Sequence, residues 1–443
     1  MKDSGIEWIG EISSTAKVYT LKFDTYMKGR IGWQGLKSKD FVEKGPYCVT
    51  STDFEDGKVN WNTCYHVSLD RYNMDPFIQI KPGDLLISKD GTIGKLALVD
   101  SLPDKACLNS HLLIIRPLNN KYLVKYLYFV LQSNIFTSYY SLVGSGTTMQ
   151  SLSQEKLGQF KFPMWSITDQ QAIADYLDAK CADIDGVSKD IEEQIETLKE
   201  YKKSVITQAV TKGLDLHAKI KDSKVPWIGK ISQKAKVYTL KFDTYMKGRI
   251  GWQGLKSKDF IEEGPYCVTS TDFENGRINW NKCYHVSLGR YNMDLFIQIK
   301  KWDLLISKDG TIGKLALVDN LPDKACLNSH LLIIRPLNNK YLVKYLYFVL
   351  QSNVFTAYYN LVGSGTTMQS LSQEKLGKFK FPIWSLSDQQ SIVKYLDMKC
   401  TDIDAALSKK EKQLDVLKEY KKSLVYEYVT GKKEVPTSWQ KKN

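Results

Sequence analysis

The sequence predicts an α+β fold, in which two mixed α/β domains are separated by two long antiparallel coiled-coil helices, with a pseudo-twofold relation between the halves. Three observations predict it. The 443-residue chain repeats itself at an offset of 219 residues, strand-like runs alternate with turns inside each copy, and each copy ends in a long segment with heptad spacing.

The repeat decides the order of the parts. Residues 18–165 and 237–384 are identical at 132 of 148 aligned positions, and residues 169–209 and 388–428 are identical at 21 of 41. Each copy therefore comprises a lead-in, a globular domain and a helix. The predicted parts are a lead-in segment at 1–17, a first domain at 18–165, a spacer helix at 166–212, a linker and second lead-in at 213–236, a second domain at 237–384, a second spacer helix at 385–431 and a basic tail at 432–443.

The globular domain combines strands and turns with helical spacing near its end. PYCVTSTDF and KVNWNTCYHV flank an EDG turn, and LLISKDGTIGKLALV has two β-rich arms around Asp90 and Gly91. CLNSHLLIIRP predicts one buried strand that stops at Pro117. NKYLVKYLYFVLQSNIF has the apolar spacing of one helix. A mixed α/β domain follows.

The segment after each domain predicts a helix with a coiled-coil seam. Apolar residues recur every seven positions from Leu177 to Val205, and Val187 and Tyr201 lie beside this stripe. About 40 helical residues extend roughly 60 Å, which is too long for a helix that packs alone. We therefore expect the two helices to pack antiparallel on each other. The predicted seam residues are Leu177, Ile184 and Leu198, facing Leu396, Ile403 and Leu417.

Composition favours a cytoplasmic protein with a polyanionic partner. The formal net charge is +13 and the pI is about 9.0, and each lysine or arginine that meets a phosphate releases condensed counterions. Apolar runs stay below the roughly 18 residues that a membrane span needs, so we expect no membrane association. The first residues, MKDSGIEWIG, lack a basic-then-apolar signal pattern, which predicts a cytoplasmic location.

The eight cysteines do not form a metal-binding or disulfide pattern. Cys48, Cys64, Cys107 and Cys181 recur 219 residues later, without CxxC spacing and without a histidine cluster beside them. We expect reduced, buried cysteines that act as small apolar side chains.

Motifs of common catalytic sites are missing from the sequence. SKDGTIGKL has the wrong glycine spacing for a phosphate loop, and GSGTTM lacks the third glycine of a dinucleotide fingerprint. The Asn-Pro-Pro-aromatic segment that marks an amino-methyltransferase is also missing, and five scattered histidines predict no metal site. We expect a chain that is not an enzyme and binds no cofactor of its own.

The order of motifs resembles the specificity subunit of type I restriction–modification systems. SKDGTIGK is followed by GSGTTMQSLSQEKLGQFKFP, a DQQAI helix start and LKEYKKSVITQAVTKG, and the second copy keeps SKDGTIGK, GSGTTMQSLSQEKLGKFKFP and DQQSI in the same order. The lead-ins DSGIEWIG and DSKVPWIG fit the same family, and the resemblance covers nearly the whole chain.

The resemblance implies two target-recognition domains that each read one half of a split double-stranded DNA site. The helices would set the distance between the halves and dock other subunits. Two methyltransferase subunits would bring S-adenosylmethionine, and two restriction/translocase subunits would bring ATP and magnesium. This chain would scaffold those subunits without catalysing their reactions.

Two departures from the family pattern affect the predicted target. Family members usually carry two different recognition domains, whereas these are almost copies, so we expect a palindromic bipartite target. The second copy also has Lys301 and Trp302 where the first has Pro82 and Gly83, just before a strand, and we expect a remodelled turn there.

Loops rather than strands should reach base edges, and basic residues should contact phosphates. An ordinary hairpin turn and a helix-capping loop are the alternatives for the SKDGTIGK and GSGTTMQ segments. The predicted DNA-binding residues are Lys28, Arg30, Lys89, Asp90, Thr92, Lys95, Thr147, Thr148 and Gln150, with Lys247, Arg249, Lys308, Asp309, Thr311, Lys314, Thr366, Thr367 and Gln369 in the second copy.

Two alternatives stay open at this point. LKEYKKS, which is intact in both helices, is either a solvated basic face over a packed seam or a surface that docks the methyltransferase. The whole chain could instead be a non-catalytic structural or protein-interaction rod with two identical heads. DNA binding that depends on a methyltransferase partner would favour the specificity subunit.

Overall fold

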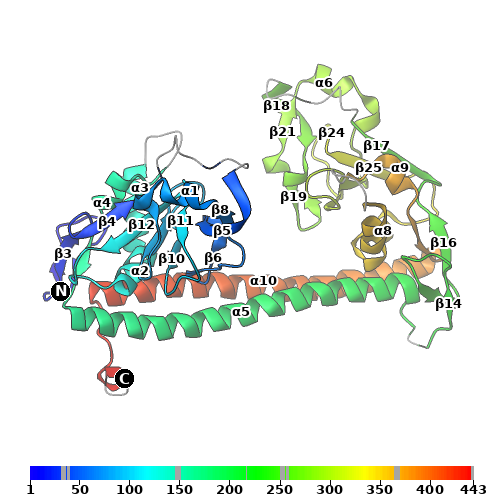
Figure 1. Ribbon diagram of the computed structural model, residues 1–443. Helices are drawn as coiled ribbons and strands as arrows, with labels where there is room; N and C mark the ends of the chain where they lie inside the picture. The colour runs from blue at the N-terminus through cyan, green and yellow to red at the C-terminus, as the bar shows by residue number, and fades with distance from the viewer. Residues whose placement is uncertain are drawn as a thin grey trace. The chain divides into compact units, whose positions relative to one another are not determined.

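The computed structural model describes residues 1–30, 36, 40–144, 151–215, 217–249, 255, 259–363 and 370–440. The chain divides into two compact units (Figure 1). Unit 1 comprises Met1–Glu192 and Lys412–Asn443, and unit 2 comprises Glu193–Glu411. The boundaries fall within the two long helices, so each unit contains one part of each of them.

Unit 1 has a lead-in hairpin followed by a domain of mixed strands and helices. Its elements before the first long helix are β1 (Lys2–Asp3), β2 (Glu11–Ile12), β3 (Lys17–Thr20), β4 (Thr25–Lys28), β5 (Phe41–Val49), β6 (Phe54–Glu55), β7 (Lys58–Val59), β8 (Tyr65–Val67), α1 (Leu69–Asn73), the 3₁₀ turn η4 (Pro76–Ile78), β9 (Leu85–Ser88), β10 (Leu96–Leu98), β11 (Ala106–Leu108), β12 (Leu112–Pro117), α2 (Val124–Gln132), α3 (Asn134–Gly144), α4 (Gln154–Gly158) and β13 (Lys161–Met164). The long helix α5 (Ile167–Lys212) follows.

A six-stranded sheet of order β4-β12-β9-β10-β7-β6 divides the core of unit 1 into two layers. Successive strand residues point to opposite faces, so Leu85 and Ile87 join the core with the helices, while Leu86 faces the second sheet, β11-β5-β8. Because both faces are covered, β9 is buried along its whole length. In Figure 1 the long helices α5 and α10 run side by side beneath the sheets of unit 1.

The structure corrects two details of the predicted domain. The expected single helix at 120–136 is two helices, α2 and α3, because the backbone of Ser133 is extended and its Oγ donates to the carbonyl oxygen of Val130 at 2.7 Å. The expected single strand at 107–117 is also divided. β11 pairs with β5, β12 pairs with β9, and Asn109–His111 form the turn between them.

Unit 2 repeats this order of elements, with a main sheet of four strands and a separate two-stranded sheet where unit 1 has one sheet of six strands. Its elements are β14 (Ile220–Asp222), β15 (Lys230–Ser232), β16 (Lys236–Thr239), β17 (Thr244–Gly248), β18 (Phe260–Val268), β19 (Phe273–Glu274), β20 (Arg277–Ile278), β21 (Tyr284–Val286), α6 (Leu288–Asn292), η9 (Leu295–Ile297), β22 (Leu304–Ser307), β23 (Leu315–Leu317), β24 (Ala325–Leu327), β25 (Leu331–Pro336), α7 (Val343–Gln351), α8 (Asn353–Gly363), α9 (Gln373–Gly377) and β26 (Lys380–Ile383). The second long helix, α10 (Leu386–Thr430), and the short α11 (Thr437–Gln440) are the last elements in the described residues.

Each unit packs a part of α5 against a part of α10. In unit 1, Leu177 shares a buried core with Leu424 and Val425, and the rings of Tyr176 and Tyr428 lie 4.7 Å apart. In unit 2, Leu396 shares a buried core with Ile206 and Val210. The mixed α+β fold and the two long helices are therefore confirmed.

The contacts within each unit show that the helices run antiparallel. From Tyr176 to Asp185 the residue numbers rise along α5, while those of their partners on α10 fall from Tyr428 to Lys421. Lys421 of α10 lies 2.6 Å from Asp185 of α5 in unit 1, and Lys202 of α5 lies 2.6 Å from Asp404 of α10 in unit 2. Asp404 and Lys421 are the copies of Asp185 and Lys202 at the offset of 219. The helices therefore exchange roles between units, because the aspartate comes from α5 in unit 1 and from α10 in unit 2.

The seam residues predicted from heptads differ in burial. Leu177, Ile184, Leu396 and Ile403 are buried, whereas Leu198 and Leu417 are only half-buried. Val187 and Tyr201, which were expected beside the seam, are exposed. Leu417 packs against the buried core that contains Leu177 and Ile184 in unit 1, and Leu396 and Ile206 share the core of unit 2, which is the order expected of antiparallel helices.

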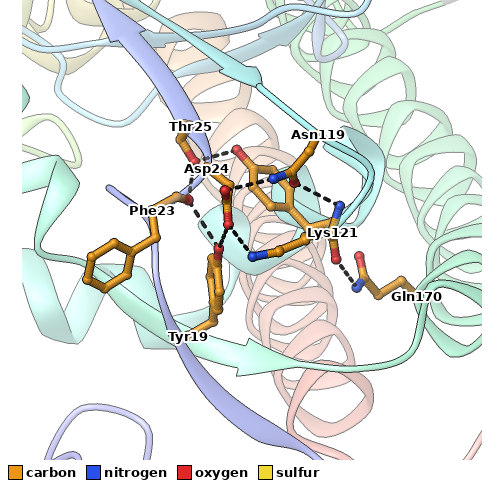
Figure 2. A network of polar contacts seen from close by, with 8 residues as sticks. Tyr19, Phe23, Asp24, Thr25, Asn119, Lys121 and Gln170 are labelled. Atoms are coloured by element: carbon orange, nitrogen blue, oxygen red, sulfur yellow. Dashed lines mark hydrogen bonds and ion pairs between the residues drawn. The ribbon is translucent and has the colours of Figure 1, made fainter.

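The start of α5 is attached to its domain by a buried glutamine, Gln170, at the edge of the polar network in Figure 2. Its side-chain oxygen accepts a hydrogen bond from the backbone N–H of Leu123 at 2.9 Å, and its Nε2 donates to the carbonyl oxygens of Lys121 and Trp165. Gln389 makes the equivalent contacts in unit 2. These bonds explain why the first glutamine of the DQQ segment is the same at the start of both helices.

The same network fixes the turn before β4. Asp24 has a positive φ of 57°, and its carboxylate accepts hydrogen bonds from Tyr19 and Asn119 and pairs with Lys121 at 2.8 Å (Figure 2). The pKa of Asp24 lies below its usual value, mainly because its carboxylate accepts a hydrogen bond from Lys121. The turn before β4 and the turn after β12, which lie at the same end of the sheet, are thereby tied to α5 through Lys121 and Gln170.

Replacing Gln170 by Leu should lower the free energy of unfolding by about 2–3 kcal/mol, because it leaves a partly buried backbone N–H and two carbonyls without these bonds. The adjacent Gln171 is exposed and hydrogen-bonds Asp175 within its own helix, so Gln171→Leu should change stability by less than about 0.5 kcal/mol. Chemical denaturation of both variants would measure the difference. Equal effects would contradict the role of Gln170.

The turn before β22 keeps the backbone of the first copy, so the expected remodelling is wrong. Gly83 donates its N–H to Val99, and Trp302 donates to Val318 at 2.6 Å. Gly83 has a φ of 84° and Trp302 a φ of 69°, a left-handed conformation that costs a bulky residue on the order of 1 kcal/mol. The Trp302 ring is exposed and lies 5.6 Å from the Lys301 ammonium.

All eight cysteines are free and buried, as the sequence predicted. Within the described ranges, the helices are too short or too polar to cross a membrane.

Candidate nucleic-acid interface

The SKDGTIGK segment forms a closed hairpin turn between β9 and β10. Ser88 Oγ donates to the carbonyl oxygen of Thr92 at 2.5 Å and accepts from the N–H of Lys95 at 2.9 Å. Gly91 and Gly94 have φ angles of 69° and 85°, which favour glycine. Thr92 and Lys95 are exposed at the tip, while Lys89 and Asp90 are half-buried. Ser307 closes the equivalent turn of Lys308, Asp309, Thr311 and Lys314 in unit 2.

Strand pairing brings this turn to the same end of the sheet as Lys28. Lys28 lies opposite Ile114 on β12, and two residues earlier on β12 Leu112 lies opposite Ser88. The N–H of Leu152 donates to the carbonyl oxygen of Lys89 at 2.8 Å, which ties the chain after residue 150 to the same place. We call this end of the sheet the loop edge. Lys247, Lys308 and Leu371 are arranged in the same way in unit 2.

Six of the predicted residues lie outside the described ranges, in the GSGTTMQ segments: Thr147, Thr148, Gln150, Thr366, Thr367 and Gln369. They stay predictions. The described residue that follows each segment, Ser151 or Ser370, leads directly to the leucine bound at the loop edge.

Arg30 and Arg249 do not lie on the surface as expected. Arg30 is 2% exposed, its Nε donates to the carbonyl oxygen of Leu108 at 3.1 Å, and its Nη2 lies 3.6 Å from the sulfur of Cys107. Arg249 makes the same contacts with Leu327 and Cys326. The guanidinium therefore connects β11 to the chain after β4.

His111 is an exposed member of the loop edge that sequence reasoning read as part of an apolar strand. The strand β12 begins one residue later, so His111 lies in the preceding turn, with a 63% exposed side chain whose Nδ1 is 3.5 Å from Asp90. His330 and Asp309 repeat the contact. The polar run Asn-Ser-His between two apolar runs is the signal that could have indicated this turn.

The LKEYKKS motif has a structural role in both helices. Lys202 and Lys421 make the ion pairs between helices, while Lys199 and Lys203 pair with Glu196 and Glu200 one turn away. Such exposed pairs contribute at most about 1 kcal/mol each. Their reciprocity accounts for the lysine at Lys202 and Lys421 in both copies, and docking of a methyltransferase by the rest of the motif stays a prediction.

In the described part of the chain, no group of three or more His, Cys, Asp or Glu side chains is arranged to hold a metal ion.

A family model of the type I restriction modification DNA specificity domain matches residues 30–197 and again residues 249–416, about three quarters of the chain. The chain belongs to this family. It is a specificity subunit of a type I restriction–modification system, as the order of its motifs predicted. A specificity subunit is the DNA-recognition part of such a system and is non-catalytic.

The specificity subunit is similar in sequence to named relatives along most of its length. It is 26% identical over 419 residues to the protein named as the type I restriction enzyme MjaX specificity subunit of Methanocaldococcus jannaschii, covering 91% of each chain. It is 23% identical over 291 residues to the MjaVIII specificity subunit of the same organism, covering 65% of each.

A solved structure shares the fold of the specificity subunit. The solved chain comes from a structural study of complex assembly and conformational transition of the type I R-M system. It superposes on the specificity subunit with a TM-score of 0.64 at 14% sequence identity. The match covers 95% of the specificity subunit and 98% of the solved chain.

Proposed function

We propose that this specificity subunit reads a bipartite, palindromic DNA target, with one half-site for each unit. The observation that carries the proposal is the near identity of the two domains, at 132 of 148 positions, together with the exchange of helix roles between the units. Two nearly identical readers should recognise the same bases. Joined through antiparallel helices, they should read them on opposite strands, as twofold proteins do on palindromic sites.

The loop edge supplies side chains suited to reading a duplex. Lys28, Lys89 and Lys95 are the cations for phosphates, and Thr92, Asp90 and His111 offer hydrogen-bonding groups for base edges. The net charge of +13 supports a polyanionic partner. The corresponding residues of unit 2 would read the second half-site.

The assembly would place catalysis on other subunits. Two methyltransferase subunits would bind S-adenosylmethionine, and two restriction/translocase subunits would use ATP and magnesium. The paired long helices would be their scaffold, and the solved relative, whose description concerns complex assembly of a type I R-M system, supports this organisation.

Methylation mapping tests the target. The chain would be expressed with its methyltransferase subunits in cells without other adenine methylation, and the methylated sites sequenced. We expect one interrupted palindrome. Two unrelated half-sites would mean that the sixteen differences between the domains change recognition. Methylation that does not depend on the chain would leave it as an interaction rod with two heads.

Two double variants that remove the same number of positive charges distinguish the effect of the loop-edge lysines on DNA binding from the effect of the overall positive charge. Lys95→Ala with Lys314→Ala should weaken DNA binding without changing the half-sites and should reduce the salt dependence by about one counterion per lost phosphate contact. Lys17→Ala with Lys236→Ala removes two exposed lysines elsewhere, and these should leave binding nearly unchanged.

A further inference from the structure

Each unit exposes a large aromatic ring near the lysine that its β4 or β17 strand brings to the loop edge. Phe77, in η4, is 61% exposed, and its copy Phe296, in η9, is 65% exposed. Met74 and Met293, just before these turns, are also exposed. Exposed apolar side chains gathered in one place indicate a binding surface, whereas isolated ones need no explanation.

The backbone that carries Phe77 is fixed on both sides. Its N–H donates to Asp75 Oδ1 at 3.2 Å, its carbonyl oxygen accepts from the Tyr26 hydroxyl at 2.5 Å, and the next residue, Ile78, is buried in the core. Phe296 has the same partners in Asp294 and Tyr245. The ring is therefore presented to solvent from a rigid support.

A buried ion pair supports this arrangement from beneath. Asp84 is fully buried and binds Arg116 through two hydrogen bonds of 2.6 and 2.7 Å. The Arg116 guanidinium lies 5.1 Å from the centre of the Tyr26 ring, whose hydroxyl holds Phe77. Asp303, Arg335 and Tyr245 repeat the series in unit 2.

A lysine of the loop edge accompanies each exposed ring. The Lys28 ammonium is 6.0 Å from the centre of the Phe77 ring, and Lys247 is 5.7 Å from Phe296. Lys28 ends β4 at the loop edge, so this lysine connects the ring to that edge, while Tyr26, which holds the Phe77 backbone, lies two residues earlier on β4. A cation beside an exposed aromatic ring suits a ligand with phosphates next to stacked bases.

We propose that Phe77 and Phe296 are wedges that stack on, and partly unstack, a base step of the DNA, while Lys28 and Lys247 contact the adjacent phosphate. Apolar side chains on rigid supports act in this way in proteins that kink a duplex. The inference rests on the proposed function, because it assigns a contact within the same DNA interface.

A difference between the copies fits this role. Pro76, beside Phe77, is replaced by Leu295 beside Phe296, and the Leu295 side chain is exposed. Proline and leucine are both residues that enter base steps as wedges. The apolar character of the tip is therefore kept where the sequence changes.

The chain itself provides a matched control. Phe23 and Phe242 are also exposed, and Lys22 and Lys241 lie 5.4 and 5.2 Å from their rings. Phe23 precedes β4, at the end of the strand away from Lys28. A similar lysine–phenylalanine pair therefore lies at the end of the strand opposite to the loop edge, where we expect no contact with DNA.

The test uses the full chain in complex with its methyltransferase subunits. The probe is a duplex with the methylated sequence found by mapping, with 2-aminopurine placed in turn at each step of the half-sites. Wild-type complex should raise the fluorescence at one step in each half-site, as unstacking does. Phe77→Ala with Phe296→Ala should abolish the rise and weaken binding about ten-fold per ring. Phe23→Ala with Phe242→Ala should change neither.

The possible outcomes are distinct. Unchanged fluorescence and affinity in Phe77→Ala with Phe296→Ala would overturn the wedge and leave DNA reading intact. Failure of this variant to assemble with the methyltransferase, seen by size-exclusion chromatography, would show a protein-docking role and also overturn it. Failure of the proposed function itself would show earlier, as methylation that does not depend on the chain.

Discussion

Replacing Leu177 by Asp should lower the free energy of unfolding of unit 1 by about 4–5 kcal/mol. Leu177 is fully buried in a core that also contains Leu424 and Val425 of the other long helix. Removing such a leucine alone costs about 2–5 kcal/mol, and the carboxylate adds the cost of a buried charge without a partner. Chemical denaturation followed by hydrogen exchange in the helices would measure the loss.

A control on the same helix makes this result specific. Val187 is 49% exposed on α5, so Val187→Asp should cost less than about 1 kcal/mol. Leu396→Asp should match Leu177→Asp, because Leu396 is buried with Ile206 and Val210 in unit 2. If Leu177→Asp were no more harmful than Val187→Asp, the packing of α5 on α10 in unit 1 would be wrong.

The long helices were predictable because their signal is local and repeated. Heptad spacing through Leu177 and Ile184 indicated a helix with a buried stripe, and both residues are buried. The same spacing misplaced Leu198, Val187 and Tyr201. An α-helix has 3.6 residues per turn and drifts from a strict heptad, and here the helices also pack on globular domains, so the buried face follows the domain.

Boundaries inside the domain were less predictable than its class. The apolar spacing continues through Ser133, but a single side-chain hydrogen bond and an extended backbone divide the helix there. The division of β11 from β12 depends on which strands each one pairs with, and pairing between distant segments leaves no local pattern.

The sequence could indicate which segments belong to the candidate DNA interface, but it could not indicate which of their side chains are exposed. Glycines and lysines marked the SKDGTIGK turn, and it lies at the loop edge with Lys28. Arg30 is also a basic residue beside a glycine, but it is buried and its Nε donates to the carbonyl oxygen of Leu108. The sequence did not show this, because a basic residue in such a segment can contact a phosphate or can hydrogen-bond a neighbouring strand. Phe77 gave no signal, since its exposure depends on partners such as Tyr26, 51 residues away.

Replacing Arg116 by Met should lower the free energy of unfolding by about 3–5 kcal/mol, because it leaves the Asp84 carboxylate buried without its cation. The hydrogen bonds with Asp84 are also the largest cause that raises the pKa of Arg116, so the guanidinium stays charged at any pH at which the protein is folded. Arg335→Met should have the same effect in unit 2 through Asp303.

Two comparisons make this last prediction specific. Lys58 and Asp100 form an exposed pair at 2.7 Å, so Lys58→Met should cost less than about 1 kcal/mol. Adding Asp84→Asn to Arg116→Met should recover much of the loss, because it removes the buried charge and keeps its shape. If Arg116→Met were as mild as Lys58→Met, or if the second change restored nothing, the ion pair would not hold the sheet together. In that case Tyr26 would also lack its support, and the rigid presentation of Phe77 would need another cause.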